Sequence, residues 1–198
     1  MDFKALIIIM MSAALVNNYV LRKFLAVCPF IGVSKELKGS VGMGGAVIFV
    51  VIFVSAATWP IYYYLLEPNG LGFLQTVVFV IVLATFVQLV EIVMKRYIPS
   101  LFKILGIYMP LMTTNCAIFG AIMLNISEEF TFAEAMVNSI GAGLGFILAL
   151  VLFTNVRQAT EKSDPPGPFK GAPILLITAA ILSLAFFAFE GVIDNLFR

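Results

Sequence analysis

The sequence predicts an all-α integral membrane protein with six membrane-spanning helices. Three observations lead to this fold class. Of the 198 residues, 62% are hydrophobic and 12% are charged, about half the charged fraction of a soluble domain. The mean hydropathy is +1.07. The apolar residues also gather into six runs close to the ~20 residues that a helix needs to cross a bilayer.

Each run is expected to form a helix, because lipid offers no hydrogen-bond partner to free backbone groups. The runs lie at about residues 3–21, 42–66, 71–94, 101–124, 133–156 and 172–193. A turn at residues 67–70 (EPNG) joins the second run to the third, and residues 127–129 begin the link between the fourth and the fifth. The longest polar stretch, residues 157–171, joins the last two runs.

The basic residues predict the orientation of these helices. Ten of the twelve Lys and Arg residues lie in the loops after the first, third and fifth runs, and only Lys4 and Arg198 lie elsewhere. Positively charged loops stay in the cytoplasm. We therefore expect both termini outside and the 157–171 loop inside the cell. The N-terminal run lacks the pattern of a cleavable signal peptide.

The cysteine and histidine content limits the chemistry. The chain has no histidine, which excludes the commonest haem ligand, most zinc sites and the usual proton-shuttling base. Its two cysteines cannot complete a four-cysteine site alone. They could form a disulfide, pack as small hydrophobic residues, or supply half of a site that another chain completes.

An internal repeat relates the two halves of the chain. Three matches define it: CPFIG at 28–32 with CAIFG at 116–120, SVGMG at 40–44 with SIGAG at 139–143, and Glu91 with Glu190. The first match is offset by 88 positions and the other two by 99. The units, about 1–97 and 98–198, each hold three spans, so they would form one membrane domain of two inverted repeats.

Broken helices are expected to carry the two cysteines. The apolar stretch FLAVCPFIGV is too short to span a bilayer, and Pro29 discourages Cys28 from the α conformation. Its counterpart has Pro110 before Thr113-Thr114-Asn115, although run length alone makes the fourth span look continuous. In inverted-repeat folds, such segments meet near the midplane of the membrane, where the functional site lies.

Three sequence words resemble one family of membrane proteins. LVNNYVLRKFLAVCPFIGVSK, LGIYMPLMTTNCAIFGAIMLN and DPPGPFKG resemble the A subunits of Rnf electron-transport complexes and, more distantly, the E subunits of sodium-pumping NADH:quinone oxidoreductases. The resemblance covers essentially the whole chain. It implies a bacterial inner-membrane component of an ion-translocating ferredoxin:NAD⁺ oxidoreductase, coupled to Na⁺ or H⁺ translocation and not catalytic by itself.

The resemblance also implies a cofactor and partners. Cys28 and Cys116 match the residues that ligate the iron of a [2Fe–2S] cluster, with two more cysteines from a homologous protein of opposite topology that resembles the E subunit of Rnf complexes. Other Rnf subunits carry flavins and iron–sulfur clusters. The candidate surroundings of the cluster in this chain are Pro29, Gly32, Asn115 and Gly120.

Four further residues are candidates for an ion path: Asn17, Asn18, Thr114 and Glu91. Support of broken backbone is the favoured interpretation of the amides and the hydroxyl, and an ion pair with Lys95 explains Glu91. Two other functions compete with electron transfer. One is an inverted-repeat secondary ion transporter without a redox centre, and the other is a passive scaffold. Neither needs two matched cysteines.

Overall fold

The computed structural model describes residues 3–16, 18, 20, 23, 25, 31–34, 37–97, 115–162 and 171–196, and every regular element in this part is helical. The elements in chain order are α1 (Phe3–Met11), η1 (Ser12–Val16), α3 (Leu37–Ile61), η2 (Tyr62–Leu66), η3 (Gly72–Leu74), α4 (Gln75–Tyr97), α7 (Cys116–Ser127), α8 (Phe132–Lys162) and α9 (Ala172–Leu196). The turns η1 and η2 are π-helical, and η3 is a 3₁₀ turn.

Three helical stretches are long and apolar enough to cross a membrane: Gly39–Leu66, Gly72–Tyr97 and Phe132–Thr160. They coincide with the predicted second, third and fifth spans. Two shorter apolar helices, Cys116–Ser127 and Pro173–Phe187, lie in the predicted fourth and sixth. The helical membrane architecture is therefore confirmed, while the total of six spans stays a prediction.

One predicted boundary is wrong. The fifth helix does not end before Arg157, because α8 continues to Lys162 and the Arg157 side chain is only 5% exposed. Leu150, Thr154 and Arg157 follow one another at helical spacing on the buried face of α8. In the fourth run, α7 begins at Cys116, and Asn115 before it has extended backbone (φ −71°, ψ 104°). The apolar run is continuous in length, but it contains a helix start at the cysteine.

The predicted tight turns at residues 67–70 and 127–129 are confirmed. Gly70 has a φ of +64°, which glycine adopts without strain, and the Asn69 side-chain amide donates to the Leu65 carbonyl at 2.7 Å. The second turn leads into α8 through a capping box, in which Glu134 Oε2 accepts from the backbone nitrogen (2.9 Å) and the hydroxyl (2.7 Å) of Thr131.

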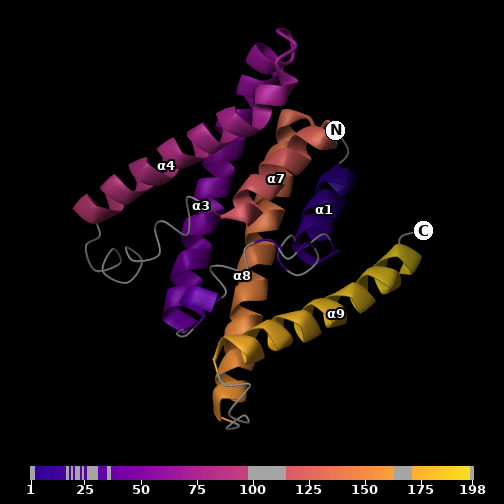
Figure 1. Cartoon of the computed structure of the whole chain (residues 1–198). Coiled ribbons are helices and arrows are strands. Elements are labelled where there is room, and N and C mark those ends of the chain that lie inside the picture. Colours follow the sequence, from indigo (N-terminus) through magenta and orange to yellow (C-terminus); the bar gives the residue numbers. More distant parts are fainter. Residues whose placement is uncertain are drawn as a thin grey trace.

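Helices α3 and α8 form the centre of the molecule and lie side by side (Figure 1). Two pairs of hydroxyl side chains connect these helices, and the repeat relates one pair to the other. Ser40 Oγ lies 2.8 Å from Thr154 Oγ1, and Ser139 Oγ donates to Ser55 Oγ at 2.7 Å. Adding 99 to 40 and 55 gives 139 and 154, so each residue pairs with the match of the other.

The close-packed glycines between α3 and α8 follow the same rule. A Cβ added to Gly44 would collide with the Ile147 side chain, and one added to Gly143 would lie 2.6 Å from Ile48 Cγ1. Again 44 and 48 plus 99 give 143 and 147. Low numbers on α3 meet high numbers on α8 throughout, so the two helices are antiparallel. We call their two ends the Ser40 end and the Ser55 end.

The other helices are arranged around this pair (Figure 1). Helix α4 leaves the Ser55 end on one side, and α9 leaves the Ser40 end on the other. Helix α1 and η1 pack on α8 through small residues, since a Cβ on Gly141 would lie 2.7 Å from the Met10 carbonyl oxygen and one on Gly145 would lie 2.8 Å from that of Ala14. Small residues permit such close approach of helices.

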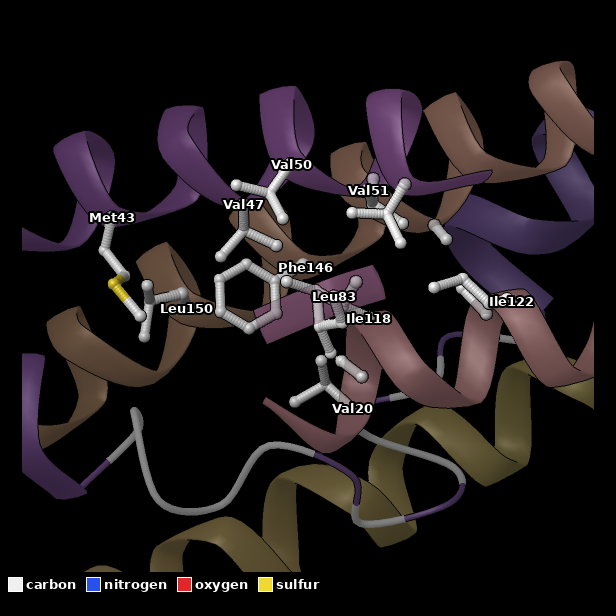
Figure 2. Packing of buried hydrophobic residues seen from close by; sticks show 14 of the residues in the cluster. Val20, Met43, Val47, Val50, Val51, Leu83, Ile118, Ile122, Phe146 and Leu150 are labelled. Carbon is white, nitrogen blue, oxygen red and sulfur yellow. The ribbon is translucent and has the colours of Figure 1, made fainter. Parts of the chain in front are cut away.

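Valines of α3 face Phe146 and Leu150 of α8 in the apolar core, with Ile118 of α7 and Leu83 of α4 closing it (Figure 2). A cavity of about 10 Å³ remains beside Val20 and Phe146. This is the lower limit for one water molecule, so the cavity is a packing gap. It is too small to hold a ligand.

At the Ser55 end, aromatic side chains gather around Trp59. Its ring centroid lies 4.5 Å from that of Tyr63 and 5.4 Å from that of Phe132. The indole Nε1 donates to the Phe130 carbonyl at 2.9 Å. These contacts join the end of α3 to the beginning of α8.

Candidate functional site

Cys116 is the first residue of α7 and is exposed. The first backbone N–H groups of a helix have no partner within the helix, and the helix dipole is positive at this end. No acidic residue lies in the first turn of α7. Cys116 therefore lies at the positive end of the α7 dipole.

Asn115 caps α7. Its Oδ1 accepts from the Ala117 backbone nitrogen at 3.0 Å, and the residue is 1% exposed. Asn is a preferred capping residue because its side chain satisfies such an orphan donor. The local sequence Asn115-Cys116 therefore starts the helix and presents the cysteine at its first position.

Gly120 packs against Leu25. A Cβ on Gly120 would lie 2.6 Å from Leu25 Cδ1. The resemblance places Gly120 in the surroundings of a cluster, whereas its described neighbour is a side chain of the same chain. Leu25 lies three residues before Cys28 in the sequence and Gly120 four residues after Cys116, so this contact joins two positions close in sequence to the two cysteines.

A buried arginine holds the segment that follows Cys28. Arg157 Nη1 donates to the Ile31 carbonyl at 3.0 Å and to Ser34 Oγ at 2.6 Å. Gly32 lies between these two partners, is half-buried and forms part of a short helical turn at 31–33. Ser40 Oγ also donates to the Val33 carbonyl, at 3.4 Å. These hydrogen bonds fix the segment to the Ser40 end of the α3–α8 pair.

A network of neutral side chains holds α7 at the Ser55 end. Asn125 Nδ2 donates to Ser139 Oγ (3.0 Å) and to Ser55 Oγ (3.3 Å), and its Oδ1 accepts from Asn138 Nδ2 at 2.6 Å. All four residues are at most 3% exposed. The far end of the helix that begins at Cys116 is therefore tied to both central helices.

The remaining predicted residues divide into three groups. Asn18 supports backbone, since its Nδ2 donates to the Ala14 and Gly145 carbonyls (3.2 and 2.8 Å) and its Oδ1 accepts from Val20 N (3.1 Å). Glu91 is half-buried on α4. The predictions for Asn17, Cys28, Pro29 and Thr114 fall outside the described residues.

Sequence reasoning missed several residues that fix the site: Arg157, Asn125, Asn138, Ser55 and Thr154. The sequence predicts Arg157 only as a basic residue of a loop. Two signals could have identified these positions. The repeat offset of 99 turns Ser55 into Thr154, and helical spacing from Leu150 puts Arg157 on the core-facing side of α8.

Within the described part of the chain, no three His, Cys, Asp or Glu residues gather into a potential metal site. A cluster bound here would need ligands beyond these residues. The surroundings of Cys116 nevertheless fit an anionic iron–sulfur centre, because the cysteine lies at a helix N-terminus and the buried Nδ2 of Asn115 has no hydrogen-bond partner among the described residues.

Comparison with known proteins finds relatives along nearly the whole chain. The family model for Rnf-Nqr subunits, described as a membrane protein, matches residues 6–193. The chain is 49% identical, over 94% of its length and 97% of the relative, to an Acetobacterium woodii protein named as the A subunit of a Na(+)-translocating ferredoxin:NAD(+) oxidoreductase complex. It is similar to proteins named as A subunits of an ion-translocating oxidoreductase complex from Syntrophotalea carbinolica (45%, over 97% of this chain and 100% of the relative) and Vibrio vulnificus (44%, over 94% and 97%).

Proposed function

The chain belongs to the Rnf-Nqr family of membrane subunits, and from this premise we propose that it holds half of an intramembrane [2Fe–2S] cluster in an ion-translocating ferredoxin:NAD⁺ oxidoreductase complex. The resemblance seen in the sequence is confirmed by the family match. Relatives named as A subunits of such complexes support the role of membrane subunit in an oxidoreductase that translocates Na⁺ or H⁺. Other subunits of that complex are its expected partners.

The observation that carries the proposal is the setting of Cys116. An exposed thiol at the first position of a capped helix, beside a buried amide donor, is suited to ligate iron as a thiolate. Cys116 and Cys28 would supply two of the four ligands. When bound, the cluster would accept and release one electron inside the membrane. The chain's own residues would hold the two cysteine segments and supply positive helix-end dipoles to offset the charge of the cluster.

The exchanged contacts of α3 and α8 support two inverted repeats. Under a two-fold relation, a residue and its partner exchange roles, as Ser40–Thr154 and Ser139–Ser55 do. In this proposal, residues 1–97 and 98–198 are the repeats of one membrane domain with six spans. The contact of Leu25 with Gly120 supports the expectation that the equivalent cysteine segments meet.

The partner that completes the cluster is expected to be a homologue of opposite topology, similar to the E subunit of Rnf complexes. Its cysteine pair would face the same point near the midplane. Two copies of this chain would share one orientation under the positive-inside rule, so their axis would run along the membrane normal. A heterodimer is therefore the better solution.

The test is to express the chain alone and with its complex, and to measure iron and acid-labile sulfide per mole together with the EPR spectrum. We expect one [2Fe–2S] signal in the complex and little or no iron in the isolated chain. A variant with both Cys28→Ser and Cys116→Ser is the control for other iron centres in the complex. A full cluster in the isolated chain would rule out a shared site. A signal that persists unchanged in the double variant would favour a transporter or scaffold without a redox centre.

The orientation has its own test. We propose that both termini face outside the bacterial inner membrane and that residues 157–171 join the last two spans on the cytoplasmic side. A cysteine introduced by Ser163→Cys, in a background without the native cysteines, should be labelled only after the cells are opened. Labelling from the external face of sealed cells would contradict the predicted orientation.

A further inference from the structure

Asn115 differs from the other buried asparagines of the described residues. Asn18, Asn125 and Asn138 each donate from Nδ2 to a protein oxygen, at distances from 2.6 to 3.2 Å. Asn115 is 1% exposed, and its Nδ2 has no partner among the described residues. Leaving a buried amide donor without an acceptor costs free energy, so an acceptor is expected to be present in the assembled protein.

The side-chain amide of Asn115 cannot be turned around to remove this problem. Its Oδ1 is needed as the acceptor for the Ala117 backbone nitrogen, 3.0 Å away. Exchange of the oxygen and the nitrogen would place two donors against each other and remove the cap of α7. The donor at Nδ2 is therefore fixed by the helix start itself.

The acceptor should be negatively charged and close to Cys116. Asn115 precedes the cysteine directly, at the positive end of a helix with no acidic residue in its first turn. No oxygen atom of the described residues near this point accepts a hydrogen bond from Asn115 Nδ2. Sulfur atoms of a cluster bound by Cys116 would be acceptors of the right charge at the right place.

We propose that Asn115 Nδ2 donates a hydrogen bond to a sulfur atom of the [2Fe–2S] cluster and thereby raises its reduction potential. This inference rests on the proposed function. A hydrogen bond to sulfur stabilises the reduced cluster more than the oxidised one, because the reduced form carries more negative charge. Asn115 is a positioning residue for Cys116, through the helix cap, and also sets the potential of the cluster.

The test is an EPR-monitored redox titration of the cluster in the purified complex. Asn115→Ser keeps an oxygen that can cap α7 but has no amide donor. Its midpoint potential should fall by an amount on the order of a tenfold change in the equilibrium constant, about 59 mV for one electron. Asn115→Asp keeps both the cap and the size of the side chain, and its added negative charge should lower the potential further.

Asn125→Ser is the matched control. It changes a buried asparagine at the other end of the same helix, where Nδ2 already has oxygen partners. We expect this variant to lose stability and to keep the wild-type potential. An equal fall of the potential in Asn125→Ser would show that the shift reports general loosening of α7, which would overturn the inference.

The outcomes separate this inference from the proposed function. If the unmodified complex contains no cluster, the proposed function fails. If the unmodified complex contains the cluster and both Asn115 variants have the wild-type reduction potential, the inference fails while the proposed function stands. The partner of Nδ2 is then another group of the protein. Pulsed EPR of the complex with ¹⁵N-labelled asparagine needs no stable variant. We expect a ¹⁵N coupling to the reduced cluster in the unmodified complex, and the complete absence of such a coupling would also overturn the inference.

Discussion

The two ends of the α3–α8 pair have the same central contact and different surroundings. At the Ser40 end a hydroxyl pair lies beside a buried guanidinium, which holds the segment after Cys28. At the Ser55 end the equivalent hydroxyl pair lies among neutral amides, which hold α7. The position that matches Arg157 at the Ser55 end is Thr58 (58 plus 99 gives 157), whose hydroxyl donates to carbonyls of its own helix.

The contacts common to both ends are those that the packing of α3 against α8 requires. The contacts found at one end only hold a further segment there. Small or hydroxyl side chains recur at both ends, because both crossings need close approach of two antiparallel helices. The residues that bind a further segment to the α3–α8 pair can differ between the two ends, because each end has to hold only one cysteine segment. A charged guanidinium holds one segment at the Ser40 end, and neutral amides hold the other at the Ser55 end. Substitutions at the two ends test this difference.

Serine at either cysteine should abolish the cluster. Cys28→Ser and Cys116→Ser each replace a soft thiolate by a hard oxygen, which ligates iron of such a cluster poorly. Although different groups hold the two cysteine segments, we expect both variants to insert normally into the membrane and to lose the [2Fe–2S] EPR signal completely. Retention of the full signal in both variants would mean that the cysteines are packing residues.

Among the residues that hold the cysteine segments, loss of the buried guanidinium should lower the stability of the protein most. Arg157→Met leaves the Ser34 hydroxyl and the Ile31 carbonyl without their partner, and hydrogen bonds from charged groups contribute about 1.5–3 kcal/mol each. We expect the unfolding free energy in mixed micelles to fall by roughly 3 kcal/mol. Thr58→Val at the matching position is the control and should cost less than about 1 kcal/mol. Equal effects would contradict the charge asymmetry of the two ends.

The glycine contacts should respond unequally to a methyl group. Gly143→Ala pushes a Cβ against Ile48 Cγ1 (2.6 Å) and close to its Cα (3.2 Å), so backbone must move. In Gly44→Ala the nearest atoms all belong to the Ile147 side chain, which can change its position. We expect a destabilisation of about 1–3 kcal/mol, larger for Gly143→Ala. Gly45→Ala is the control, because nothing lies within 4 Å of its added Cβ.

The smallest effect is expected from the central hydroxyl pairs themselves. Ser40→Ala and Ser55→Ala each remove a contact between helices, and such hydrogen bonds in membrane proteins average about 0.6 kcal/mol. Ser55 also accepts from Asn125, so its loss should cost slightly more. Thermal unfolding of both variants in the same detergent would measure the difference. A much larger loss for Ser40→Ala would show that the two ends are not equivalent in packing.

The helical membrane fold could be predicted because long apolar runs and tight turns are local signals. The repeat offset of 99 could also be read from the sequence, at Ser40, Gly44 and Glu91. The contacts of α3 with α8 that follow this offset were not predicted and come from the structure. The boundary of α8 could not be predicted from hydropathy. Arg157 is charged, and only its tertiary partners Ile31 and Ser34 make burial favourable.

The site was predicted only in part, for a similar reason. The cysteine words and the cap at Asn115 are local and could be found in the sequence. The network of Asn125 and Asn138 depends on three helices that meet in space, and neutral amides in apolar runs have no distinctive spacing. Gly120 is predicted in the surroundings of a cluster, and that role stays a prediction; its close contact with Leu25 could not be read from the sequence.

The length of α8 determines how deep its polar groups lie in the bilayer. Trp and Tyr favour the interface between lipid and water, which places the Trp59 cluster and the beginning of α8 at one headgroup layer. Arg157 follows Phe132 by 25 residues (157 minus 132), which corresponds to about 38 Å along the helix axis. The hydrocarbon core is only about 30 Å thick, and an average tilt of about 20° shortens this distance little. With the Trp59 cluster at one headgroup layer, a helix of this length is therefore expected to carry the Arg157 guanidinium to the opposite headgroup layer, beyond the lipid tails.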